Sequence, residues 1–390
     1  MTHVNIPHFS RFPRSVKSPH TIRPNLAAGL IPRNSVMQQV RSVLNYYPLD
    51  FQPLQIELLG SAGGMSGAQF WRVAVVRGSL DPALADPAPA ALCLRRWPPE
   101  HPTPERLRFI HAVLAHAARN GITFLPVPLR AVGGESFVQH AGHLWELAPW
   151  MPGAADFDRA PTSTRLQAAM QALAQFHVAV RDFKAPRPLG SAASAISRRL
   201  TMLRQLLAGG SDDLSRAITT TTWPELAPLA RQFIAALPAA IPRAIAELEP
   251  LADLPLPLQP CLRDIWHDHV LFTGNEVTGI VDFGAVDVDT PATDIARLLG
   301  SLASISPPRR GEGVGEGPHE ADIWRDGLAA YATMRPLSEG EVRAVAALDT
   351  SGTILAGCNW IRWVYVERRQ FENQAAIVER FCRLLVRLKS

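Results

Sequence analysis

Apolar and polar residues alternate in three short stretches near the start of the chain. Residues 54–58, 71–75 and 91–97 show a period of two, which is typical of strands with one buried face. The glycine-rich run 60–67 separates the first two stretches, and the Pro/Ala/Asp-rich run 81–89 separates the second from the third. We therefore expect two strands joined by a glycine-rich turn, then a loop and a third strand.

A helix and two further strands are expected next. Apolar residues recur at helical spacing from Leu107 to Ala117, and Gly121 ends that pattern. Strand candidates lie around Phe137 and over residues 145–148. Together these elements predict a small antiparallel sheet that carries one helix.

Helical patterns dominate after residues 149–153, where two prolines interrupt the earlier pattern. One helix is predicted over residues 165–181, and two apolar runs around a T-G-N-E turn predict a hairpin over residues 270–281. Residues 305–318 are rich in Pro and Gly, so we expect a flexible loop there. The fold class that follows is α+β, with a small antiparallel sheet lobe and a larger, mainly helical lobe.

This order of elements predicts three regions. Residues 1–48 form an extension that we expect to be poorly ordered, residues 49–150 the sheet lobe and residues 151–390 the helical lobe. The first 49 residues contain no Asp or Glu, which superficially resembles an organelle transit peptide. A disordered extension, or a true start at Met37, explains the same composition.

Composition excludes several classes of partner. The net charge of +4 is small, and no run of five or six like charges suggests a nucleic-acid surface. No stretch approaches the roughly 20 apolar residues that span a bilayer, so we expect no membrane partner. The four cysteines show no C-x-x-C pair or zinc-site spacing, which fits a reducing cytoplasm. We therefore expect a small-molecule partner, and the oligomeric state stays open.

Lysine is nearly absent from this chain. Lys17, Lys184 and Lys389 are the only lysines. A phosphate-binding cation in the sheet lobe must therefore be an arginine or a histidine.

The candidate chemistry lies on either side of the predicted hairpin. Asp264 stands just before its first strand, and Asp282 just after its second strand, in a D-F-G sequence. The two ends of a hairpin meet, so both carboxylates are expected at the same end. Phosphoryl transfer needs one carboxylate to orient the attacking hydroxyl and another to hold Mg²⁺ against the phosphates. We assign the first role to Asp264 and the second to Asp282.

This ordered set resembles the aminoglycoside phosphotransferase family, which includes choline and homoserine kinases and shares the protein-kinase fold. The family signature is H-G-D-x-x-x-x-N, a hairpin, D-F-G and then D-P-x-x-D-L-A. The resemblance implies that Asp264 is catalytic, that Asp282 binds metal and that Asp294 is a buried support for the catalytic loop. It also implies transfer of the γ-phosphoryl group of ATP or GTP to a hydroxyl of a small molecule, with Mg²⁺ or, alternatively, Mn²⁺.

The same resemblance implies a nucleotide site between the two lobes. Residues 60–67 resemble the nucleotide-covering loop, residues 145–153 resemble the hinge whose backbone meets the adenine, and Arg95 takes the place of the usual lysine. The residues expected to contact the nucleotide are Gly60, Gly63, Gly64, Ser66, Gly67, Arg95, Glu146 and Trp150.

Two departures from the signature leave a second hypothesis open. His269 stands where the family has a metal-binding Asn, and hard Mg²⁺ prefers oxygen to imidazole nitrogen. Leu262 and Arg263 replace the usual His-Gly. Arg95 has no evident acidic partner on the following helix, where Glu105 is the only acid. The alternative is a nucleotide-binding pseudokinase with a regulatory or scaffolding role.

Several other residues allow a bland and a functional interpretation. His267, Asp268 and His269 could form the metal trio of a hydrolase, although three neighbours rarely converge on one ion. His177 lies on an apolar helix face and is expected in the core, as are Trp360 and Trp363. The acceptor is not identified by the sequence. The acids considered for contact with a cationic acceptor are Asp268, Asp287, Asp289 and Glu367.

Overall fold

The computed structural model describes residues 33–48, 51–59, 67–77, 91–184, 194–218, 223–305, 320–369, 371 and 374–389. Val43–Ser390 form one compact unit, apart from Met1–Ser42. The predicted extension includes a helix, α1 (Arg33–Leu44), over its last part. The predicted flexible loop lies outside the described residues from position 306 onward, as do the predicted contacts Gly60, Gly63, Gly64 and Ser66.

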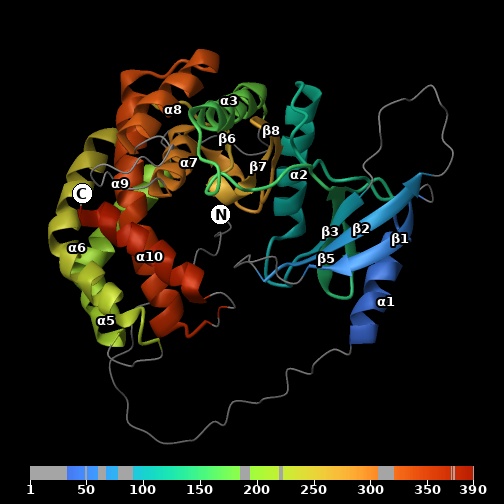
Figure 1. The fold of residues 1–390 in the computed structure, drawn as a ribbon, viewed down its shortest axis with the longest axis horizontal. Coiled ribbons are helices and arrows are strands. Elements are labelled where there is room, and N and C mark those ends of the chain that lie inside the picture. The colour runs from blue at the N-terminus through green and yellow to red at the C-terminus, as the bar shows by residue number, and fades with distance from the viewer. Residues whose placement is uncertain are drawn as a thin grey trace, which may run out of the picture. The chain divides into compact units, whose positions relative to one another are not determined.

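The predicted small sheet is antiparallel and has five strands in the order β1-β2-β3-β5-β4 (Figure 1). Its strands are β1 (Phe51–Leu58), β2 (Gln69–Arg77), β3 (Ala91–Arg96), β4 (Val138–His140) and β5 (His143–Pro149). Trp71, Leu92 and Trp145 are fully buried, and the rings of Trp71 and Trp145 stack with centroids 5.4 Å apart. The period of two in the sequence thus marks the strands because one face of the sheet is buried.

The helix α2 (Pro104–Arg119) follows β3, as the helical spacing predicts. Thr103 caps its first turn by accepting a hydrogen bond from the backbone N–H of Arg106 at 3.2 Å. On its buried face, Leu107 packs with Trp97 and Phe137 in an apolar cluster. This packing fixes α2 against the sheet.

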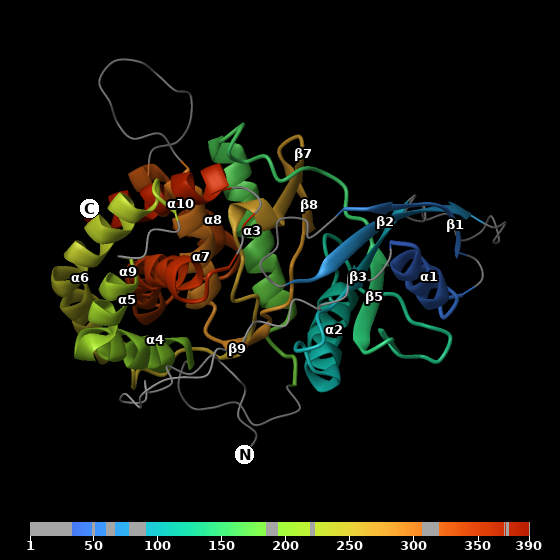
Figure 2. The same cartoon turned by 90° about the horizontal axis from the view of Figure 1, so that it is seen from below.

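Helices form most of the chain beyond the sheet (Figures 1 and 2). They are α3 (Ser163–Ala179), α4 (Ser194–Gln205), α5 (Ser211–Ala217), α6 (Ala227–Leu248), α7 (Ala292–Ser304), α8 (Glu320–Met334), α9 (Glu339–Ile361) and α10 (Gln374–Lys389). Four short turns of irregular helix are η1 (Leu206–Gly210), η2 (Glu249–Leu251), η3 (His267–His269) and η4 (Arg362–Val366). Within the described part of the chain, no helix is long and apolar enough to cross a membrane.

Two pairs of short strands lie among these helices. β7 (Val270–Thr273) and β8 (Glu276–Ile280) form the predicted hairpin. β6 (Gln259–Cys261) pairs with β9 (Asp287–Asp289), which the sequence analysis did not predict. This second pair brings the segment before Asp264 against the segment after Asp282, so the two predicted site segments are joined at both ends.

Gly153 connects the end of the sheet region to the hairpin. Its φ is +95°, and a Cβ there would lie 2.5 Å from Thr278 Oγ1 and 2.7 Å from the carbonyl oxygen of Phe272. Ala154 pairs with Phe272 through two backbone hydrogen bonds of 2.9 Å. Only glycine fits this close approach, which fixes the segment at residues 149–153 against β7.

Candidate active site

Asp294, at the start of α7, holds the loop that precedes Asp264. Its carboxylate is fully buried and accepts hydrogen bonds of 2.6 Å from the backbone N–H groups of both Leu262 and Arg263. His177 Nε2 donates to the same carboxylate at 3.0 Å, and His177 Nδ1 accepts from the Tyr331 hydroxyl at 2.7 Å. His177 is therefore a core histidine with both ring nitrogens hydrogen bonded, as expected. The buried Asp294 carboxylate holds the loop before Asp264 through its hydrogen bonds to two backbone N–H groups.

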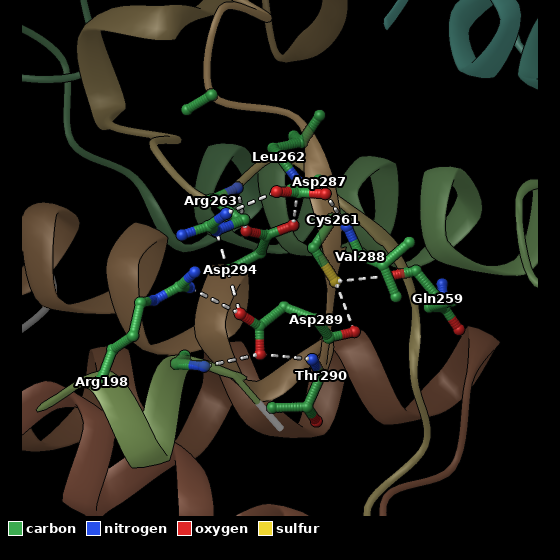
Figure 3. Close-up of polar contacts among 12 residues, drawn as sticks. Arg198, Gln259, Cys261, Leu262, Arg263, Asp287, Val288, Asp289, Thr290 and Asp294 are labelled. Atoms are coloured by element: carbon green, nitrogen blue, oxygen red, sulfur yellow. Dashed lines mark hydrogen bonds and ion pairs between the residues drawn. The ribbon is translucent and has the colours of Figure 1, made fainter. Parts of the chain in front are cut away.

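Arg263 occupies the position at which the family signature has glycine. Its φ is +66°, a left-handed conformation that costs an L-residue about 1–2 kcal/mol. An ion pair fixes the side chain of Arg263, whose guanidinium lies 3.1 Å from Asp287 Oδ2 (Figure 3). Two backbone hydrogen bonds to Asp294 and this ion pair therefore impose the conformation that glycine would adopt freely.

Asp289 is a second buried carboxylate beside this loop. It accepts hydrogen bonds from the backbone N–H groups of Ala195 at 3.2 Å and Thr290 at 3.0 Å. Arg198 lies 3.1 Å from its other oxygen (Figure 3). Asp289 thus anchors the first turn of α4 and is fully buried, so it does not face an acceptor.

Asp264 is held by three donors that converge on Oδ1. Arg297 donates through Nη2 at 2.6 Å and through Nε at 3.2 Å, and Trp266 donates through Nε1 at 2.9 Å. Burial of the carboxyl raises the pKa of Asp264, but the Arg297 charge and these hydrogen bonds outweigh it and leave the pKa lowered. The side chain is 46% exposed, so an ionised carboxylate is accessible at neutral pH.

His269 links Asp264 to Asp282. Its Nδ1 donates to the backbone carbonyl of Asp264 at 2.9 Å, because a carbonyl can only accept. In the neutral ring this leaves the Nε2 lone pair free, and Nε2 lies 3.9 Å from Asp282 Oδ2 and equally far from Asp268 Oδ1. The hairpin therefore brings the Asp282 carboxylate and the Nε2 atom of His269 to the same end.

Arg95 lies between two carboxylates. Its Nη2 is 3.3 Å from Asp282 Oδ1, its Nη1 is 3.9 Å from Glu146 Oε1, and its guanidinium carbon is 3.4 Å from the Trp97 ring centroid. Glu146 also accepts a hydrogen bond from His111 Nε2 at 2.8 Å. Burial raises the pKa of Glu146, yet His111 and then Arg95 lower it overall.

The partner of Arg95 thus comes from the sheet and not from the helix. Glu146 is paired directly opposite Arg95 across strands β5 and β3. Glu105, the only acid considered for this role, is 75% exposed and lies near Arg108. The sequence does not predict this pair, because cross-strand register is not readable from one strand alone.

Residues 63–337 match the phosphotransferase enzyme family. This chain belongs to that family. It is 26% identical to a homoserine kinase of Methylocella silvestris over 280 residues, which are 71% of this chain and 76% of that protein. It is 29% identical to a homoserine kinase of Rhodopseudomonas palustris over 62% of this chain, and this match covers 64% of that protein, less than two thirds.

A solved structure supports the same fold. Amicoumacin kinase hAmiN, in complex with AMP-PNP, Ca²⁺ and Ami, superimposes with a TM-score of 0.60 at 13% identity, over 91% of this chain and 94% of that one. The predicted kinase-like α+β fold of this phosphotransferase is confirmed, as is its expected class, a small-molecule O-phosphotransferase.

The remaining predicted nucleotide contacts lie near the two ends of β3, with Gly67 just before the strand that pairs with the end of β3 and Trp150 beside its start. Gly67 has a φ of +72° just before β2, and Trp150 follows β5 with its backbone N–H bonded to Ala91 at 3.0 Å. The Arg72 guanidinium lies 5.1 Å from the Trp150 ring centroid. Glu146, another predicted contact, is bonded to His111 and lies 3.9 Å from Arg95, and its contact with a nucleotide stays a prediction.

The hydrolase hypothesis requires three side chains of residues 267–269 to surround one metal ion. Among the described residues, the only three potential ligands that meet closely enough for one ion are His177, Cys261 and Asp294. The ring nitrogens of His177 and the oxygens of Asp294 are already hydrogen bonded, so their proximity reflects support of the loop. The possible ligand atoms of His267, Asp268 and His269 do not come close enough together to hold one ion. This agrees with the interpretation of His267 as an ordinary loop histidine.

Arg297 is the functional candidate that the sequence analysis missed. It lies one helical turn after Asp294 on α7 and pairs with Asp264. Its guanidinium carbon is 3.7 Å from the Trp266 ring centroid, and that of Arg380 is 4.0 Å from the same ring. An arginine three positions after the buried aspartate was the available signal.

Proposed function

We propose that this phosphotransferase moves the γ-phosphoryl group of ATP or GTP to a hydroxyl that Asp264 orients and deprotonates. The observation that carries this proposal is the His269 bridge, with one ring nitrogen on the Asp264 carbonyl and the other 3.9 Å from Asp282. A half-buried, ionised Asp264 can accept a proton from the acceptor hydroxyl. Asp282, after the returning strand, can then hold a metal against the phosphates.

A divalent metal fits between Asp282 and His269. Their facing atoms are 3.9 Å apart, and two ordinary ligand bonds of about 2.1 Å each would span this distance with one ion between them. Mg²⁺ is the proposed ion, and it would neutralise charge on the phosphate oxygens. Because imidazole is a softer ligand than an amide oxygen, Mn²⁺ is the expected alternative.

The pseudokinase alternative has lost part of its support. It rested on His269 and on the apparent lack of an acidic partner for Arg95. Glu146 supplies that partner, and Arg95 reaches Asp282 at the same time. An arginine held between these carboxylates is suited to orient nucleotide phosphates beside the metal.

The acceptor is proposed to be a small hydroxyl compound, as in the related kinases. The curated relatives are named homoserine kinases, and the solved structure is named an amicoumacin kinase. We further propose a cytoplasmic location, which the four free cysteines support. The direct test is nucleotide consumption by the purified protein against amino alcohols, hydroxy amino acids, sugars and aminoglycosides. Absence of phosphorylated product with every acceptor would contradict the proposal.

Asp282→Ala is expected to weaken binding of the metal–nucleotide complex about 10- to 100-fold, because it removes a charged metal ligand. Affinity for the metal-free nucleotide should change much less. Calorimetry with and without Mg²⁺ measures both quantities. Glu276→Ala, at an exposed position in the same hairpin, is the matched control. Equal Mg²⁺-nucleotide affinity in Asp282→Ala and in the control would contradict the assigned metal role.

His269→Asn is expected to raise activity with Mg²⁺ and to lower the ratio of Mn²⁺- to Mg²⁺-supported activity. The amide oxygen is a harder ligand than the imidazole nitrogen that it replaces. The measurement is this ratio in both proteins at saturating nucleotide and mildly alkaline pH. If His269 only supports the loop through its bond to Asp264, the ratio should not move while both proteins stay active.

A further inference from the structure

A small pocket lies beside Asp264 in the helical part of the molecule. It encloses about 30 Å³, room for about two water-sized groups. Its walls come from α4, α7, α9, α10 and the loop after Asp264. The lining residues that matter here are Arg199, Trp266, Arg297, Asp349, Thr353 and Arg387.

The arginines of this pocket are not all neutralised. Arg387 forms two short hydrogen bonds to Asp349, at 2.6 and 2.5 Å. Arg199 instead donates to the carbonyl of Leu348 and to Ser351 Oγ, the latter at 3.1 Å, and within the described part of the chain no ion pair joins it to an acid. Loss of solvation lowers the pKa of Arg199 to about 10, so it is still a cation at neutral pH.

The two arginines next to each other on α4 have different partners. Arg198 pairs with the buried Asp289, which also binds the backbone N–H of Ala195 in the first turn of the helix. This contact fixes α4 and directs Arg199 toward α9, where Ser351 Oγ accepts a hydrogen bond from its guanidinium. The unneutralised cation is therefore held in place by the fold and is not a surface side chain.

Arg297 connects this pocket to the proposed site of transfer. Its guanidinium stacks on Trp266 and donates to Asp264 Oδ1, while the same side chain lines the pocket. A group bound in the pocket therefore contacts the arginine that holds the catalytic carboxylate. An acceptor anchored there would carry its hydroxyl close to Asp264.

Resting on the function proposed above, we propose that this pocket binds a carboxylate of the acceptor between Arg199 and Arg297. The acceptor class is then a small hydroxy acid or hydroxy amino acid. A planar carboxylate suits the guanidinium fork and the small volume of the pocket. Its binding shares Arg297 with Asp264, which loosens the contact on Asp264 and places the hydroxyl beside it.

Three of the four acids considered for a cationic acceptor are already paired with arginines. Asp287 pairs with Arg263, Asp289 with Arg198, and Glu367 with Arg369 at 2.7 Å. These carboxylates are already neutralised by arginines. The fourth acid, Asp268, is exposed, lies 3.9 Å from His269 Nε2 and does not line the pocket. Among the residues that line the pocket, the charge without an ion pair is therefore the positive charge of Arg199.

The kinetic test uses pairs of acceptors that differ only in the carboxylate, such as L-homoserine with 3-aminopropan-1-ol and L-serine with ethanolamine. We expect the acids to have a kcat/KM about 10- to 100-fold higher than their partners, which is the range for a charge-assisted contact. Arg199→Met should raise the acceptor KM by a similar factor, leave the nucleotide KM unchanged and remove the preference. Arg199→Lys should restore part of it.

The matched control is Arg204→Met, an exposed arginine on the same helix that pairs with Glu249. It should behave like the wild type. If nucleotide is consumed equally well, or better, with the amino alcohols, the carboxylate pocket is wrong while the phosphotransferase proposal stands.

A binding test separates the two proposals if no acceptor is turned over. Melting temperatures are measured with each hydroxy acid and with its neutral amide at the same concentration. The acid should raise the melting temperature of the wild type and of Arg204→Met, but not of Arg199→Met. Equal shifts with acid and amide, equal shifts in Arg199→Met, or no shift in any protein would each overturn the pocket assignment, whatever the activity.

Discussion

Asp264→Asn is expected to lower kcat by about 10²- to 10⁴-fold, the usual contribution of a positioned general base. An amide cannot take the proton of the acceptor hydroxyl at neutral pH. Its oxygen can still accept the hydrogen bonds that Arg297 and Trp266 donate to the carboxylate. The fold and the affinity for metal and nucleotide should therefore persist, because this carboxylate acts on the acceptor.

The measurement is turnover with the best acceptor of the panel, together with nucleotide affinity and melting temperature. Asp212→Asn is the control, since it changes an exposed carboxylate in the first turn of α5, outside the hairpin and its flanking residues. Turnover within a few-fold of wild type in Asp264→Asn would remove the role assigned to Asp264. A loss of nucleotide affinity of the same size would instead place this carboxylate at the metal.

Asp294→Ala is expected to lower the free energy of unfolding by about 3–5 kcal/mol, the range for removing one partner from a buried charged network. The substitution leaves the buried N–H group of Leu262, the N–H group of Arg263 and the ring of His177 without their acceptor. It also releases the strained backbone of Arg263, so Asp264 loses its position and turnover should fall as well.

Denaturant titration measures this effect. Asp326→Ala is the control, because Asp326 lies on α8 in a pair with the exposed Arg325 and should matter by no more than about 0.5 kcal/mol. Asp294→Asn should lie between wild type and Asp294→Ala, because one oxygen acceptor persists. Equal stability of Asp294→Ala and the control would mean that the loop is held by other contacts.

Much of the fold was readable because its signals are local. The period of two marked β1, β2 and β3, the helical spacing marked α2 and the T-G-N-E turn marked the hairpin of β7 and β8. The hairpin in turn predicted that Asp264 and Asp282 face the same end, since the ends of a hairpin must meet. The motif alone suggested His269 only as a metal ligand. In the structure His269 also lies between these two residues, bonded to the Asp264 carbonyl and 3.9 Å from Asp282.

Other features were not readable because they depend on contacts between distant segments. β6 and β9 are three residues long, and β6 contains Pro260, so neither carries a strand signal of its own. The pair of Arg95 and Glu146 depends on the register between β3 and β5. Glu105, the only acid on the following helix, is exposed and does not pair with Arg95.

The sequence by itself determined the kinase-like α+β fold and the family, because strand period, turn chemistry and motif order act over short distances along the chain. It also predicted that Asp264 and Asp282 lie at the same end of the hairpin. Only the tertiary structure decided that Arg297 holds Asp264 and that Arg199, which forms no ion pair with an acid of the described residues, lines the pocket. Those outcomes depend on how α4, α7 and α9 are rotated and packed against one another. Side chains far apart in sequence set that packing, so no local pattern records it.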